Sequence, residues 1–246
     1  MQDCQKILTA AKADFLRIRG NLLKGGEVSG AEKTLYRYYC EAVLVFRHLQ
    51  GPGAVEVLTD ADWVERLQHG GRVVFGISSR ATARKQAPTF ALSSTEEAWF
   101  QLYFREIRPE NIRPDKTCNR FFMSPAGEGV CNVTKDLNRL HEMYKLPAIR
   151  SNDMRKAVEA AAAQTLPADQ QQAVKEYLTL RVPAAKNATA TVCVLLDSLA
   201  GFTSDDGTPG TSTENRDFSA FVSQFPVSLD GQFLFVVTFF RLQVDE

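Results

Sequence analysis

The chain has 246 residues, of which 44% are hydrophobic and 24% are charged, and its 29 basic residues balance 29 acidic ones. These proportions are those of an ordinary soluble globular protein with ample material for a hydrophobic core. No run of residues reaches the ~18 apolar side chains of a membrane-spanning helix, and the apolar run over residues 233–240 is too short to be an anchor.

The N-terminal part of the chain is predicted to be helical. Apolar residues at helical spacing predict a helix over residues 2–19. Residues 29–32 have the pattern of a capping box, so a long helix is expected from there to about Leu49. Residues 51–53, a Gly-Pro-Gly triplet, end this helix, and residues 59–62 begin a short one.

The middle of the chain changes to β-type sequence. Residues 72–77 and 89–92 are short β-type runs separated by a polar, basic stretch, and they predict a β-hairpin. A helix rich in aromatic side chains follows from residue 94, and these aromatics are expected in the core. Residues 121–124 are predicted to be extended, before a turn over residues 125–129.

Helices return towards the C-terminus. Asn132 is expected to cap a helix whose apolar stripe includes Met143, and Ser151 is expected to cap the next one. A third helix begins at Pro167, whereas residues 201–217 contain few apolar side chains and are expected to be disordered. Helices, a hairpin and further helices in this order indicate an α+β fold that is mainly α.

The five cysteines are far apart and show no CxxC spacing. With no recognisable signal peptide, this pattern indicates reduced thiols inside the cell. The cysteines are Cys4, Cys40, Cys118, Cys131 and Cys193.

The zero net charge hides an uneven distribution. Residues 72–156 carry 15 basic and 9 acidic side chains, whereas residues 197–246 carry 2 basic and 8 acidic ones. A basic middle followed by an acidic tail is typical of a phosphate-binding domain whose tail tunes binding. The alternative is that these charges are scattered over a solvated surface.

Several classes of site have no support in the sequence. The chain lacks a GxxxxGK[ST] phosphate loop, and its three histidines, at positions 48, 69 and 141, lie far apart. We therefore expect neither a metal site nor a cofactor. Glu96 and Glu97 are expected to be capping groups at a helix N-terminus, where the helix dipole favours negative charge.

Five blocks of the chain, taken in order, share one family resemblance. They are residues 55–63, 73–92, 121–133, 136–146 and 151–180. Together they resemble the crypton-type tyrosine recombinases, over roughly two thirds of the chain. The resemblance implies a tyrosine-recombinase-like, phage-integrase-like catalytic core with a small antiparallel β-hairpin or sheet.

The resemblance also implies three regions. Residues 1–28 form an N-terminal helix and linker, a candidate remnant of the family's DNA-clamping domain. Residues 29–196 form the catalytic domain. Residues 197–246 form an acidic, largely disordered tail that ends in an apolar segment.

In that family a tyrosine attacks the scissile DNA phosphate, while two arginines, a hairpin lysine and histidine or tryptophan residues stabilise the transition state. The resemblance places the second arginine at Arg155, and a planar guanidinium can hold two phosphate oxygens at once. An arginine in the first turn of a helix opposes the helix dipole, so an anionic partner is expected. A bound anion, Asp153 or Glu159 could fill that role.

The other catalytic positions of the family do not carry suitable side chains here. The first arginine falls near Gly51 or Pro52, and Arg47 lies about one turn too early to replace it. The last tyrosine is Tyr177, which is expected on the apolar face of a helix. The family's histidines fall at Ser151 and Leu180, its hairpin lysine at Ala81 and its nucleophile near Thr189.

We therefore expect a transposon-derived nuclear protein that binds double-stranded DNA weakly and has lost strand cleavage, with Arg155 as a relic of the catalytic site. The alternative is a recombinase-derived protein-interaction module or a remnant that does not bind DNA. A protein partner for the acidic tail is also expected. The residues predicted to contact phosphate are Arg72, Arg80, Arg84, Lys85, Arg155 and Lys156.

Overall fold

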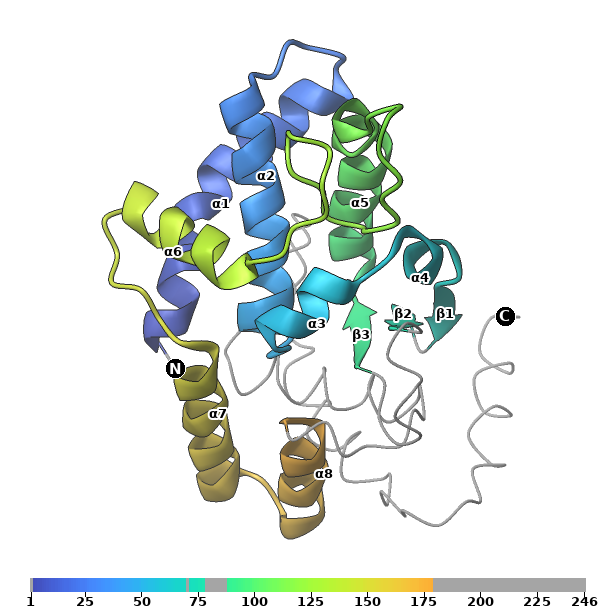
Figure 1. Ribbon diagram of the computed structural model, residues 1–246. Coiled ribbons are helices and arrows are strands. Elements are labelled where there is room, and N and C mark those ends of the chain that lie inside the picture. Colours follow the sequence, from blue (N-terminus) through green and yellow to red (C-terminus); the bar gives the residue numbers. More distant parts are fainter. Residues whose placement is uncertain (1, 70, 78–87, 179–246) are drawn as a thin grey trace, which may run out of the picture. The chain divides into compact units, whose positions relative to one another are not determined.

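The computed structural model describes residues 2–69, 71–77 and 88–178 (Figure 1). Helices predominate among them, accompanied by a three-stranded antiparallel sheet. This confirms an α+β fold that is mainly α. The stretch at residues 201–217, which is expected to be disordered, lies outside the described residues. No helix in the described ranges is both long and apolar enough to cross a membrane.

Helices α1 (Gln2–Leu23) and α2 (Gly30–Ala42) pack against each other (Figure 1). Side chains of α1 that recur every three or four residues, such as Phe15 and Ile18, are buried. The helix is longer than predicted, because it continues through Gly20. Glycine destabilises a helix by only about 1 kcal/mol relative to alanine, and tertiary packing overrides this cost.

The predicted capping box begins α2, and a wider helical turn ends it. Ser29 Oγ accepts a hydrogen bond from the Glu32 N–H at 3.2 Å, and the Glu32 carboxylate accepts one from the Ser29 N–H at 2.9 Å. The chain then continues as a π-helix, η1 (Val43–Arg47), where the sequence predicts regular α-helix to about Leu49. The prediction of the start is confirmed and that of the end is wrong.

Two short helices, α3 (Pro52–Val57) and α4 (Asp60–Val64), follow. The triplet at residues 51–53 ends one helix as predicted, but it also begins α3, since proline suits the first position of a helix. The hydroxyl of Thr59 accepts a hydrogen bond from the backbone of Asp62, which confirms the predicted start of α4.

The sheet contains β1 (Leu67–His69), β2 (Arg72–Gly76) and β3 (Thr89–Leu92), in that order. The predicted hairpin pairing is confirmed, with Phe75 opposite Phe90 in the register. The sequence does not predict β1, because this strand has only three residues and is too short to show an alternating pattern.

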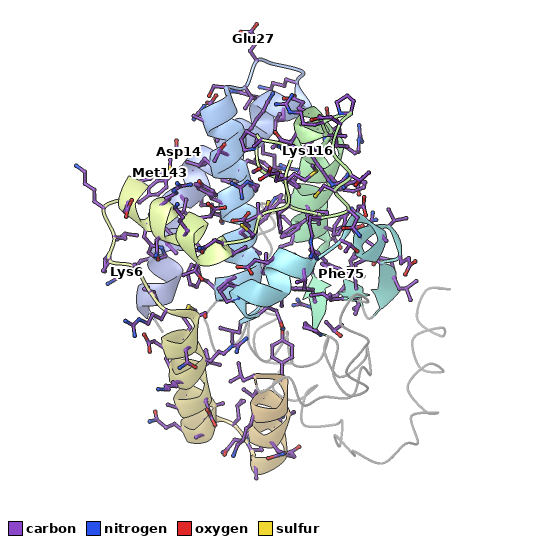
Figure 2. The ribbon with its side chains drawn as sticks, viewed as in Figure 1. Lys6, Asp14, Glu27, Phe75, Lys116 and Met143 are labelled. Atoms are coloured by element: carbon purple, nitrogen blue, oxygen red, sulfur yellow. The ribbon has the colours of Figure 1, made fainter. Side chains whose placement is uncertain are left out.

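Aromatic side chains build the core that the sequence predicts. The Trp63 ring lies 5.5 Å from the ring of Phe75 on β2 (Figure 2) and 5.3 Å from that of Phe121, and all three side chains are buried. The segment of Phe121, predicted to be extended, instead bends at residues 121–122 between two isolated bridges, and it is tied to the preceding helices because the Phe121 N–H donates to the Leu58 carbonyl at 2.8 Å. The helices of this region are α5 (Ser94–Leu102), the π-helix η3 (Tyr103–Ile107) and the 3₁₀-helix η4 (Pro109–Asn111).

Three helices complete the described part of the chain. Asn132 caps the first of them as predicted, but Met143 is 54% exposed and does not belong to the buried stripe (Figure 2). Ser151 is not a cap, because the helix begins one residue earlier than a serine cap requires and Arg150 occupies the cap position. The three are α6 (Val133–Met143), α7 (Ser151–Thr165) and α8 (Ala168–Leu178), the last beginning after Pro167 as predicted.

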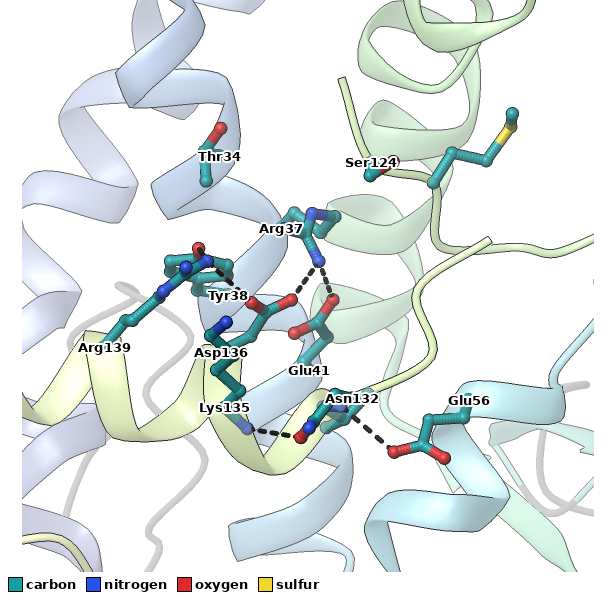
Figure 3. A network of polar contacts seen from close by, with 12 residues as sticks. Thr34, Arg37, Tyr38, Glu41, Glu56, Ser124, Asn132, Lys135, Asp136 and Arg139 are labelled. Atoms are coloured by element: carbon teal, nitrogen blue, oxygen red, sulfur yellow. Dashed lines mark hydrogen bonds and ion pairs between the residues drawn. The ribbon is translucent and has the colours of Figure 1, made fainter. Parts of the chain in front are cut away.

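A buried charge cluster joins α2 to α6 (Figure 3). Arg37 Nη1 donates to Glu41 Oε1 and to Asp136 Oδ2, each at 2.6 Å. Two carboxylates therefore share one guanidinium, and Glu41 Oε2 is buried without a hydrogen-bond partner among the described residues. Burial raises the pKa of Glu41 to about 8, because the attraction of Arg37 does not compensate for lost hydration.

We predict that Glu41 makes the protein less stable at alkaline pH. The folded-state pKa lies above the unfolded value of 4.5, so the contribution to stability is full below that value and is lost as pH rises through about 8. We expect the free energy of unfolding to fall by roughly 2–5 kcal/mol between about pH 5 and pH 9. Urea denaturation at a series of pH values measures this fall, which Glu41→Gln should largely remove.

Glu142→Gln is the matched control for this prediction, because Glu142 lies on the exposed side of the same α6. It should keep the pH dependence of the unaltered protein. An unchanged pH dependence in Glu41→Gln would show that Glu41 is ionised in the folded state.

Candidate functional site

The structure brings together few of the residues that are predicted to contact phosphate. Arg155 and Lys156 are neighbours in the first turns of α7, and Lys156 is exposed. Arg72 lies on β2, where its Nη1 donates to the carbonyl of Ala91 on β3 at 3.2 Å. Arg80, Arg84 and Lys85 lie outside the described residues.

Arg155 reaches from α7 to the end of the second helix. Its Nε donates to the carbonyl oxygen of Leu49 at 3.0 Å. A Cβ atom added to Gly51 would lie 3.3 Å from Arg155 Nη2, so the guanidinium lies directly beside Gly51. The glycine leaves room for the arginine head group.

The expectation that Asp153 or Glu159 balances Arg155 is wrong. The protein partner of the guanidinium among the described residues is the carbonyl of Leu49. Carbonyls at the C-terminal end of a helix carry partial negative charge and can replace a carboxylate as an acceptor. Burial lowers the pKa of Arg155, and Tyr177 partly opposes this shift. Arg155 is therefore a partly desolvated cation without a carboxylate partner in the described ranges, an environment that favours an anionic ligand.

The backbone just after η1 adopts an unusual conformation that presents its carbonyls to α7 and α8. The N–H of His48 bonds to the Val43 carbonyl and that of Gln50 to the Leu44 carbonyl. Between them Leu49 has φ of 53°, in the left-handed region that few residues other than glycine adopt. The carbonyls of His48 and Leu49 both accept hydrogen bonds from side chains of the C-terminal helices.

Tyr177 on α8 binds the same segment. Its hydroxyl donates to the His48 carbonyl at 2.7 Å and accepts from Gln50 Nε2 at 2.8 Å. The predicted place of Tyr177 on a buried helix face is confirmed, since only 5% of the residue is exposed. The sequence gives no sign of the polar contacts of the hydroxyl, because their partners lie 127 and 129 residues away.

A second buried ion cluster lies next to this segment. The Glu96 carboxylate lies 3.1 Å from His48 Nε2 and 3.3 Å from Arg47 Nε, and it also caps α5 through the Ser93 N–H. Burial alone would raise the pKa of Glu96, but these partners outweigh it and lower the pKa to about 2. The capping role of Glu96 is confirmed. Arg47 belongs to this cluster, so the structure gives it a place in an ion pair.

No three metal-binding side chains gather anywhere in the described part of the chain. No family model, curated protein or solved structure matches this chain. The resemblance to recombinases therefore rests on the sequence blocks alone.

We predict that Glu96 is essential for stability although its neighbour Glu97 is not. Glu96→Gln leaves His48 and Arg47 beside a neutral group in a buried place, and should cost about 3–5 kcal/mol. Glu97 pairs with Arg66 at 2.9 Å in a partly exposed place, so Glu97→Gln should cost roughly 0–1 kcal/mol. Chemical denaturation of the two variants measures the difference, and equal losses would refute the prediction.

The same carboxylate should make the protein sensitive to acid. The folded-state pKa of Glu96 lies below the unfolded value of 4.5. Its contribution to stability is therefore present above about pH 4.5 and is lost as pH falls towards 2. Glu96→Gln should flatten the stability profile in this window, whereas Glu97→Gln should not.

Proposed function

We propose that the protein binds double-stranded DNA weakly through contacts with phosphates and does not cleave it. The observation that carries this proposal is the environment of the Arg155 guanidinium. Its guanidinium is partly buried, has no carboxylate partner among the described residues, and lies beside the small residue Gly51. A planar fork in such a place suits a phosphate oxygen pair.

The position of Gly51 supports a recombinase origin for this site. The resemblance places the family's first arginine near Gly51 and its second at Arg155. These two positions are 104 residues apart in the sequence, yet the Arg155 head group lies 3.3 Å from a Cβ added to Gly51. A pair of arginines at these positions could hold one phosphate, and the chain retains one of the two.

The environment of Tyr177 supports the loss of cleavage. It is the last tyrosine in the sequence, and its hydroxyl is buried, donates to the His48 carbonyl and accepts from Gln50. A nucleophile in phosphoryl transfer needs access to the phosphate and a group that accepts its proton. Tyr177 has a structural role in this proposal, and the positions of the family's lysine and histidines carry Ala81, Ser151 and Leu180 in the sequence.

A recombinase-derived protein-interaction module is the second candidate. Two observations support it. The net charge of the chain is zero, and Arg72, one of the residues predicted to contact phosphate, donates a hydrogen bond to the Ala91 carbonyl within the sheet instead. Absence of DNA binding at low salt would favour this candidate.

The proposal predicts salt-dependent DNA binding that depends on Arg155. Fluorescence anisotropy with short duplex DNA, from about 50 to 200 mM salt, should show affinity that falls steeply with salt. Arg155→Gln should weaken binding about 3- to 10-fold and reduce the slope of log affinity against log salt by about 1. Arg155→Lys should retain the slope and lose part of the affinity, because it keeps the charge but not the fork.

Arg105→Gln is the matched control for the binding experiment. Arg105 is an exposed residue of η3 whose contact is with its neighbour Glu106 at 3.3 Å, so the variant removes one positive charge elsewhere. Its affinity should stay within about twofold of the unaltered protein. Binding that ignores salt, or an equal loss in both arginine variants, would contradict the proposed site.

We further predict that no covalent complex with DNA forms. A nicked duplex that traps the phosphotyrosine intermediate of an active recombinase should give no protein–DNA band on a denaturing gel. A covalent band that survives Tyr177→Phe would reveal another nucleophile, and one that disappears with it would identify Tyr177; either band would overturn the proposed loss of cleavage.

A further inference from the structure

Three consecutive residues, His48, Leu49 and Gln50, are held by side chains from α7 and α8. Arg155 binds the middle carbonyl, while Tyr177 binds the carbonyl before it and the side chain after it. These contacts join segments that are 106 to 129 residues apart. The conformation of the middle residue is therefore coupled to both C-terminal helices.

Leu49 is the strained member of this segment. Its φ of 53° places a side chain with a Cβ in the left-handed region, and its side chain is buried. Such a conformation persists only where surrounding contacts over-determine it, and such positions cluster at functional sites. The direction of the Leu49 carbonyl depends on this conformation, and that carbonyl is the acceptor of Arg155 Nε.

We propose that Tyr177 is a positioning residue for Arg155. Its hydroxyl holds His48 and Gln50 on either side of Leu49, and this keeps the Leu49 carbonyl directed at the guanidinium. Without the hydroxyl, Leu49 relaxes towards the right-handed region, its carbonyl turns away, and Arg155 loses its fixed orientation. Through Tyr177, helix α8 thereby affects how tightly Arg155 binds an anion, although Tyr177 itself is not the anion's partner.

The proposal rests on the proposed function for its biological meaning, but its test does not need DNA. Proton–nitrogen NMR of the arginine Nε–H groups reports the Arg155 hydrogen bond, and the signal that disappears in Arg155→Lys is assigned to Arg155. The Cα chemical shift of Leu49 reports its backbone conformation. Both are measured on the full chain without ligand.

Tyr177→Phe removes the hydroxyl and keeps the ring. We expect hydrogen exchange at Arg155 Nε–H to accelerate by about tenfold or more. We also expect the Leu49 Cα shift to move towards values of the right-handed region. Gln50→Met, which removes one of the two contacts of the hydroxyl, should change both signals in the same direction but less, and it provides the test if Tyr177→Phe does not fold.

Tyr144→Phe is the matched control. The Tyr144 hydroxyl also donates one part-buried hydrogen bond between distant segments, to Asp14 Oδ2 at 2.8 Å, and it makes no hydrogen bond to residues 48–50. It should leave the Arg155 and Leu49 signals unchanged. Unchanged signals in Tyr177→Phe, or equal changes in Tyr144→Phe, would overturn the positioning role.

A DNA titration of Tyr177→Phe then links the two proposals. We expect its affinity to fall about 3- to 10-fold, as for Arg155→Gln, with no further loss in the double variant. Failure of the unaltered protein to bind DNA would overturn the proposed function, whereas the NMR signals decide the positioning role in either case. The two failures are therefore distinguishable.

Discussion

The described structure depends on the acceptors at the end of the second helix. After η1 the carbonyls of His48 and Leu49 cannot continue the helical hydrogen-bond ladder, and an unpaired buried carbonyl is costly. Side chains from α7 and α8 satisfy them, through Arg155 and Tyr177. The need of these two carbonyls for hydrogen-bond donors thus attaches α7 and α8 to the N-terminal part. The same contacts place the Arg155 guanidinium beside Gly51.

The second helix also carries the two buried ion clusters. Arg37 pairs with Glu41 and with Asp136 of α6, while Arg47 and His48 pair with Glu96 at the start of α5. Each cluster joins elements that are distant in the sequence, but their electrostatics differ. Burial dominates at Glu41 and raises its pKa, whereas at Glu96 the ion pairs and hydrogen bonds outweigh burial and lower the pKa. We therefore expect the stability of the protein to fall in both acidic and alkaline solution.

Arg155 differs from an ordinary surface arginine in its hydration and in its hydrogen-bond partner. A surface arginine is hydrated and gains little from an anion. Arg155 has lost part of its hydration and has a carbonyl where a carboxylate would neutralise it. Gly51 removes the side chain that would otherwise fill the space beside the guanidinium. A partly desolvated cation with free space beside it is the geometric basis of the proposed phosphate contact.

Local patterns in the chain were enough to predict the capping residues Ser29, Thr59 and Asn132, because a cap depends on neighbours a few positions away. The hairpin of β2 and β3 and the aromatic core were predicted because the type and spacing of apolar side chains mark strands and buried helix faces. They also placed Arg155 near the start of a helix, although it lies in the second turn of α7 and not the first, and they showed that Tyr177 is the last tyrosine. The partners of both side chains came only from the tertiary structure, since they lie more than 100 residues away. The acceptors are backbone carbonyls, which every residue carries, so no side-chain pattern could mark them. Tertiary packing alone decided that Leu49 and Gly51 meet Arg155.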